Sequence, residues 1–169
     1  MLRILDILED TMVDGPGFRT SIYCAGCDHA CPGCHNPQSW DFDGGREMSV
    51  EEIMRIIEAD PYANVTFTGG DPMYQAAGFA ELAHEIHRRT NKDIWCYTGF
   101  RFEQLLQQDQ RRLLSEIEVL VDGPFVQMLR DEDLRFRGSS NQRIIDVPAS
   151  LFAGQVILWK EEDPCIIGY

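Results

Sequence analysis

Residues 24–36 read Cys24-Ala-Gly-Cys27-Asp-His-Ala-Cys31-Pro-Gly-Cys34-His-Asn36, and this stretch holds four of the six cysteines of the chain. Such crowding indicates a chemical purpose, because thiolates are soft ligands for iron–sulfur clusters, zinc or copper(I). Gly26, Pro32 and Gly33 interrupt the stretch, which favours a loop that curls until several sulfur atoms converge. The stretch therefore predicts a metal centre around which the chain is organised.

The spacing of the cysteines distinguishes between kinds of metal centre. Cys27, Cys31 and Cys34 form C-x3-C-x2-C, which supplies three thiolates and leaves one iron of a four-iron cluster open to another ligand. With Cys24 included, four thiols could form a closed zinc site, although zinc ribbons usually carry two separated pairs. Covalent haem attachment at Cys31-Pro-Gly-Cys34-His35, or a thioredoxin-like pair there, leaves Cys27 unexplained. We expect Cys24 to be a thiol at a strand end.

The composition favours a single domain over residues 1–169 in the cytoplasm. The net charge is −13, from 15 basic and 28 acidic residues, which argues against nucleic acid as a partner. Charges interrupt the first ten residues, and the chain contains no apolar run of about 18 residues, so neither a secretory signal nor a membrane span is predicted. Cytoplasmic thiols stay reduced, which favours metal ligation over disulfides. Cys96 and Cys165 are expected to be ordinary thiols.

Strand and helix patterns alternate along the chain. Predicted strands cover residues 2–8, 19–25, 64–68, 93–98, 118–121, 143–147 and 155–159. Predicted helices begin after the capping box Ser49-Val-Glu-Glu52, span residues 76–89, and occupy a stretch around 105–114 that is interrupted near Asp109. Alternation of this kind is typical of parallel strands joined by right-handed crossovers. It predicts an α/β fold whose sheet curves into a partial barrel.

Four turns that contain glycine are expected to meet at one rim of this sheet. They are the cysteine loop, Gly69-Gly70-Asp71-Pro72, Thr98-Gly99 and Asp122-Gly123. Each follows a predicted strand, and the carboxyl ends of parallel strands share one edge. Glycines let a ligand approach the backbone, whose N–H and C=O groups could hold the amino and carboxylate groups of an amino acid, while Asp71 could take an ammonium group.

Motifs spread over nearly the whole chain resemble those of the radical S-adenosylmethionine superfamily. Within it, they are similar to the glycyl-radical activating enzymes of anaerobic ribonucleoside-triphosphate reductases. The segments that carry the resemblance are Asp14-Gly-Pro-Gly-Phe-Arg19, Gly26-Cys27-x3-Cys31-Pro-Gly-Cys34-x-Asn36, Trp40, Gly69-Gly-Asp-Pro72, Trp95-x-Tyr97-Thr-Gly99, Val121-Asp-Gly123, Phe125-Val-Gln127 and Arg137-Gly-Ser-Ser-Asn-Gln142.

The resemblance implies a partial (β/α) barrel of the radical S-adenosylmethionine type that carries a [4Fe-4S] cluster on Cys27, Cys31 and Cys34. S-adenosylmethionine would chelate the fourth iron, and an electron from a donor such as a flavodoxin would cleave it to a 5'-deoxyadenosyl radical. That radical would generate the glycyl radical on the large subunit of the reductase, with no catalytic residue needed beyond the cluster and cofactor. The implied cofactor-binding residues are Gly33, Cys34, His35, Gly70 and Asp71. Of these, Asp71 would support the residues that contact the cofactor and would not contact it directly.

The sequence departs from the superfamily at two positions and leaves two other functions open. Gly33 stands where an aromatic residue commonly precedes the third cysteine, and Asp71 stands where glutamate is usual. One alternative is a different radical enzyme, which either activates another glycyl-radical enzyme, such as a formate-lyase type, or acts on a small molecule. The other is a zinc-stapled binding module.

Two groups of basic residues stand outside these motifs. His84 and His87 are expected on a solvated helix face. Arg135, Arg137 and Arg143 are either surface charges or contacts to a partner or cofactor.

Overall fold

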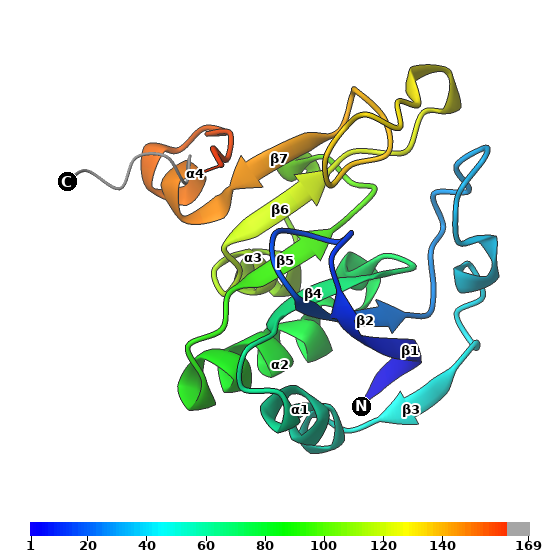
Figure 1. Cartoon of the computed structure of the whole chain (residues 1–169). Helices are drawn as coiled ribbons and strands as arrows, with labels where there is room; N and C mark the ends of the chain where they lie inside the picture. Colours follow the sequence, from blue (N-terminus) through cyan, green and yellow to red (C-terminus); the bar gives the residue numbers. More distant parts are fainter. Residues whose placement is uncertain (162–169) are drawn as a thin grey trace.

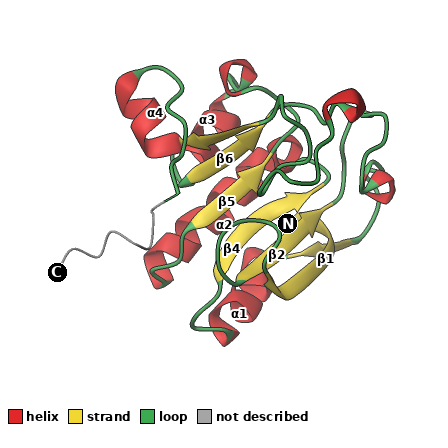
Figure 2. Cartoon of the chain, turned by 45° about the horizontal axis from the view of Figure 1, so that its top comes forward, coloured by secondary structure: helices red, strands yellow, loops and turns green. Residues whose placement is uncertain are grey.

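The computed structural model describes residues 1–161 and is built on one open sheet in a mixed α/β fold (Figures 1 and 2). Seven strands lie in the order β3-β1-β2-β4-β5-β6-β7. The strands are β1 (Leu2–Thr11), β2 (Arg19–Cys24), β3 (Arg46–Met48), β4 (Asn64–Gly69), β5 (Ile94–Tyr97), β6 (Val119–Asp122) and β7 (Arg143–Asp146). The central strands β2, β4, β5 and β6 are parallel, whereas β1, β3 and β7 pair antiparallel. The predicted parallel centre is therefore confirmed, and the sheet does not close.

Within residues 1–161, helices cover one face of the sheet (Figure 1). The helices are α1 (Val50–Ala59), α2 (Ala76–Arg89), α3 (Gln108–Leu114) and α4 (Val147–Ala153). Side chains of α1, α2 and α3 form the main hydrophobic core with one face of the strands. A smaller cluster on the opposite face contains Trp95, Val119 and Val121. Because alternate residues of a strand point to opposite faces, Cys96 lies buried in the main core while Trp95 lies in the smaller cluster.

The predicted capping box opens α1. The hydroxyl of Ser49 accepts a hydrogen bond from the backbone N–H of Glu52 at 3.1 Å, and the Glu52 carboxylate accepts one from the backbone N–H of Ser49 at 2.7 Å. These bonds satisfy backbone donors that the first turn of a helix cannot use internally. The helix then buries Ile53, Met54 and Ile57 against the core.

Replacing Ser49 by alanine should lower the free energy of unfolding by about 1 kcal/mol, because it removes the acceptor for an N-terminal N–H of α1. Urea unfolding followed by circular dichroism measures the change. Ser140→Ala is the control, since Ser140 is exposed and lies outside any helix. Equal midpoints for the two variants would contradict the assigned cap.

The structure corrects the prediction at both sheet edges. Residues 155–159 do not form a strand; they contribute the isolated bridge between Ile145 and Leu158. The helix α4 and the strand β3 were missed, because seven and three residues respectively are too short for a clear hydrophobic period. The predicted helical stretch is interrupted at residues 105–107, between a 3-10 helix, η3 (Phe102–Gln104), and α3, whereas Asp109 lies within α3. Cys165 lies outside the described residues, and within residues 1–161 no helix is long and apolar enough to cross a membrane.

Candidate functional site

The four glycine-containing turns meet at the carboxyl ends of the parallel strands, as predicted. The backbone N–H of Gly70 donates to the carbonyl of Cys24 at 2.8 Å, and that of Asp71 donates to the carbonyl of Gly26 at 2.9 Å. These two bonds join the turn after β4 to the start of the cysteine loop. On the other side, Gly123 donates to the carbonyl of Phe100 at 2.9 Å, which joins the turns after β5 and β6. Backbone bonds therefore join the four turns in two pairs, and the Asp71 carboxylate connects the pairs by accepting from the backbone N–H of Gly99.

Cys27, Cys31 and Cys34 lie on the loop that leaves β2, and their side chains are partly exposed. Burial raises the pKa of Cys27 to about 11, so a metal that binds there must displace a proton. Cys24 is fully buried within the main core. Within residues 1–161, no three His, Cys, Asp or Glu side chains are close enough together to hold a metal ion. The three thiols thus lie on one loop, but their sulfur atoms do not converge on a single point.

The donor set nevertheless has the chemistry that an iron–sulfur cluster requires. The three cysteines are free thiols within eight residues, and thiolates are the usual protein ligands of such clusters. Gly33 lies between the second and third cysteine with a φ of +76°, a conformation that glycine adopts without steric cost. The backbone N–H of Asn36 donates to the sulfur of Cys34 at 3.4 Å, and hydrogen bonds to sulfur help set the potential of a cluster.

Asp71 is the most highly connected side chain of the rim. It is 1% exposed, and its carboxylate accepts hydrogen bonds from four donors: the Nε2 of His29 at 2.6 Å, the hydroxyl of Thr98 at 2.8 Å, and the backbone N–H groups of Gly99 and Met73, both at 2.9 Å. The carboxylate is committed to groups of the protein itself. Its position favours a role in holding the surrounding turns in place over a role as the partner of a ligand's ammonium group.

Two cavities flank the cysteine loop. One, of about 570 Å³, is lined by His35, Asp14, Tyr97 and the segment 134–138. The ring of His35 also packs edge-on against Phe125, with centroids 5.2 Å apart. The side chains of His35 and Tyr97 thus come together at one opening, although they are distant in sequence.

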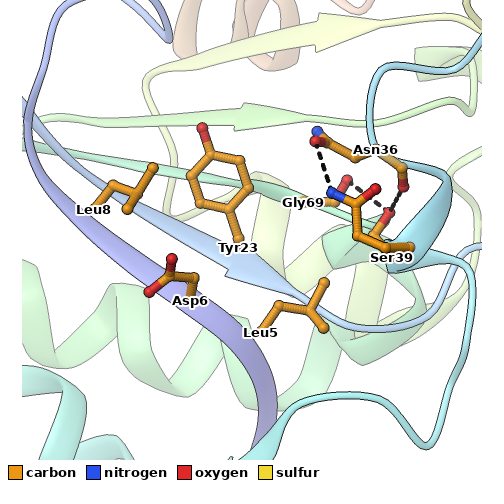
Figure 3. A pocket seen from close by; sticks show the side chains of 8 residues that line it. Leu5, Asp6, Leu8, Tyr23, Asn36, Ser39 and Gly69 are labelled. Atoms are coloured by element: carbon orange, nitrogen blue, oxygen red, sulfur yellow. Dashed lines mark hydrogen bonds between the residues drawn. The ribbon is translucent and has the colours of Figure 1, made fainter.

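The other cavity, of about 440 Å³, lies between β1 and the end of the cysteine loop (Figure 3). Tyr23, Asn36, Ser39 and Gly69 contribute to its wall. The hydroxyl of Ser39 donates to the carbonyl of Asn36 at 2.6 Å and to that of Gly69 at 3.3 Å. Sequence reasoning missed this cavity, because β1 approaches the loop only through the antiparallel pairing of β1 with β2.

Comparison with known proteins identifies the family. Residues 13–145 match the family model described as "4Fe-4S single cluster domain". A protein of Salmonella typhi called anaerobic ribonucleoside-triphosphate reductase-activating protein is 39% identical over 140 residues, which cover 78% of this chain and 90% of that protein. Proteins with the same name are 34% identical in Haemophilus influenzae, over 85% of this chain and 97% of theirs, and 33% identical in Enterobacteria phage T4, over 78% and 86%. The chain belongs to the family of anaerobic ribonucleoside-triphosphate reductase-activating proteins.

The part of the chain that matches the cluster-domain model contains the cysteine loop and all four turns of the rim. The glycines of the second turn are sterically required. A Cβ atom on Gly70 would lie 2.4 Å from the carbonyl oxygen of Gly26, and one on Gly69 would lie 2.4 Å from the backbone nitrogen of Cys24. Both neighbours are backbone atoms, so the turn and the start of the cysteine loop fit together only without side chains.

Gly70→Ala should therefore lower the free energy of unfolding by about 1–3 kcal/mol, because the added methyl group forces two backbone segments apart. Gly138→Ala is the matched control, since the nearest atom to its Cβ, at 3.1 Å, belongs to a Phe125 side chain. Urea unfolding of both metal-free variants gives the comparison. If Gly70→Ala is no less stable than Gly138→Ala, the close approach at the rim is wrong.

The basic residues outside the motifs have partners within the chain itself. Arg143 contacts the Asp122 carboxylate at 2.5 Å and the Glu103 carboxylate at 2.8 Å, and it lowers the pKa of Glu103 to about 2. Arg137 donates to the carbonyl groups of Ser140 and Gln142. These two arginines thus stabilise the segment between β6 and β7. Arg135 pairs with Glu161 at the surface.

The two helix histidines lie at the surface of α2, beside the segment that follows α3. The side chain of His84 is 60% exposed, and the Nε2 of His87 contacts the carbonyl of Glu116 at 2.7 Å. Sequence reasoning missed His29 and the buried side chain of Arg19. A histidine inside the cysteine motif was the available signal for His29, and an arginine in an otherwise apolar strand was the signal for Arg19.

Proposed function

We propose that this chain is an iron–sulfur enzyme that activates anaerobic ribonucleoside-triphosphate reductase by radical S-adenosylmethionine chemistry. The observation that carries the proposal is the placement of Cys27, Cys31 and Cys34 on one loop at the carboxyl rim of a parallel sheet, where α/β folds place their sites. Membership of the activating-protein family supports it. The partner proposed from the relatives' names is the reductase, and specifically its large subunit.

The cofactors proposed are a [4Fe-4S] cluster on the three cysteines and S-adenosylmethionine beside it. When bound and reduced, the cluster supplies the electron that cleaves the sulfonium, which provides the radical chemistry for activation. Gly33, Cys34, His35 and Gly70 are proposed to line the cofactor. Gly33 is exposed and Gly70 is partly exposed, and His35 lines the larger cavity. Asp71 would act indirectly, by holding the turn that carries Gly70.

The open sheet is proposed to serve as the partial barrel of this superfamily, with residues 1–169 as one domain. Helices α1, α2 and α3 cover one face, and both cavities beside the cysteine loop include residues that point to the other face, Tyr23 and Tyr97. An open sheet leaves that face accessible to a segment of a large protein. A cytoplasmic location and a donor such as a flavodoxin belong to the same proposal, because thiolate ligands and a reduced cluster need a reducing compartment.

The test uses the full chain, purified and reconstituted with iron and sulfide without oxygen. We expect about four irons per chain, an electron paramagnetic resonance signal after reduction that changes when S-adenosylmethionine is added, and release of 5'-deoxyadenosine. Addition of the reductase large subunit should then produce a stable glycyl radical, whereas a formate-lyase type of glycyl-radical enzyme should remain inactive. Bound zinc without iron would overturn the proposal in favour of a zinc-stapled module. Cofactor cleavage that activates only the formate-lyase type would overturn the proposed partner.

A further inference from the structure

We propose that His29 is a positioning residue, which anchors the cysteine loop to the buried carboxylate of Asp71 and thereby determines how firmly the loop retains its metal centre. The inference rests on the proposed function in one respect, namely that the loop binds an iron–sulfur cluster. It goes further because it assigns a task to a residue within the C-x3-C-x2-C segment that is not itself a ligand. It also explains why the Asp71 carboxylate bonds to groups of the chain itself.

The contact between His29 and Asp71 connects segments that are far apart in sequence. The Nε2 of His29 donates to Asp71 at 2.6 Å across 42 positions of the chain. The same carboxylate oxygen accepts from the hydroxyl of Thr98 and the backbone N–H of Gly99. One buried oxygen therefore ties the loop after β2 to the turn after β5, while the other oxygen accepts from Met73 and fixes the turn after β4. A carboxylate with this many donors has little freedom to move.

The imidazole of His29 is also held by packing. Its ring lies edge-on to Phe100 with centroids 4.6 Å apart, and it is tilted against Tyr74 at 5.7 Å. The side chain is only 16% exposed. A Cβ on Gly99 would lie 2.5 Å from the ring, so the absence of a side chain at position 99 leaves the space that the His29 ring occupies. Hydrogen bonding and aromatic packing together fix both the direction and the position of the ring.

The backbone beside His29 shows that the loop is constrained at this point. Ala30 has a φ of +48°, which is uncommon for a residue with a side chain and costs free energy unless surrounding contacts compensate. The anchored ring is the neighbouring contact that can do so. His29 lies between Cys27 and Cys31, and a fixed point there limits how far those thiols can separate. Groups that orient metal ligands from outside the coordination shell typically change metal affinity by about 10- to 100-fold when removed.

The experiment measures metal retention by the reconstituted full chain and does not depend on activity. Wild type, His29→Ala, His29→Gln and the control His84→Ala are mixed with an iron chelator without oxygen, and the loss of the brown cluster absorbance is followed. We expect iron to leave His29→Ala about 10- to 100-fold faster than wild type. His29→Gln should restore part of the difference, because its amide can donate to Asp71. His84→Ala should match wild type, since that histidine lies on the surface of α2.

A second comparison separates positioning from general stability. Metal-free His29→Ala should keep the circular dichroism spectrum of wild type, and the effects of His29→Ala and Asp71→Ala on iron release should be less than additive, because both remove the same contact. Equal iron release by wild type and His29→Ala would overturn the inference, as would a metal-free His29→Ala that no longer folds, since the histidine would then support the fold as a whole. If wild type itself takes up no iron, the proposed function fails and the inference falls with it.

Discussion

Serine at Cys27, Cys31 or Cys34 is expected to abolish retention of the proposed cluster, so that each variant holds less than one iron per chain whereas the wild type is expected to hold about four. The oxygen of serine is a poor replacement for the soft thiolate that iron–sulfur clusters need. The partly exposed cysteine loop contributes little to the hydrophobic core, so the metal-free variants should remain folded. Iron analysis and the visible spectrum after anaerobic reconstitution measure the result, and circular dichroism reports the fold.

Cys24→Ala is the control for this series. Cys24 belongs to the same cysteine-rich stretch, but its thiol is fully buried among the apolar side chains of the main core. Burial also raises its pKa well above the ordinary value, which opposes formation of a thiolate ligand. The control should therefore retain its iron while losing some stability through the small cavity. If Cys24→Ala loses the metal and one of the other three variants keeps it, the assignment of ligands is wrong.

Arg19→Ala is expected to lower the free energy of unfolding by about 3 kcal/mol, a large share of the roughly 5–15 kcal/mol that stabilises a typical domain. The Arg19 side chain is fully buried. It donates to the Thr66 hydroxyl at 2.8 Å, to the Val65 carbonyl at 2.8 Å and to the Pro16 carbonyl at 3.1 Å, and it pairs with Asp93. Removing the guanidinium leaves these acceptors without their donor and opens a cavity beside Trp95.

Urea unfolding of the metal-free chain measures this decrease in the free energy of unfolding, and two further variants serve as comparisons. Arg19→Lys keeps the charge but not the planar fork of donors, so it should be intermediate in stability. Arg88→Ala removes an exposed arginine that pairs with Glu85 on α2 and should leave the midpoint nearly unchanged. Because Arg19 also holds the segment that carries Asp14 and Pro16 against β4, its loss should loosen one wall of the larger cavity. A stability equal to that of Arg88→Ala would refute the role of Arg19 as a buried clamp.

The elements that sequence reasoning placed well are those with strong local signals. Helix α2 coincides with the predicted residues 76–89, since its apolar side chains recur with the helical period. The capping box of α1 is present because its bonds join residues only three apart. The strand β7 also agrees with the predicted residues 143–147. The missed elements are β3, which pairs antiparallel with the distant strand β1, and the short helix α4. Such elements depend on the neighbours that the fold provides more than on their own pattern.

The sequence by itself determined the chemistry of the chain and the order of its central elements. Three thiols at C-x3-C-x2-C spacing and glycines after successive strands can be read locally, because residue type and spacing carry that information. Only the tertiary structure decided that the carboxylate of Asp71 faces His29, Thr98 and Gly99, and that Cys24 points into the core while its neighbours in the motif do not. Hydrogen bonds between residues tens of positions apart, and the face to which a strand turns each side chain, arise when the strands pair.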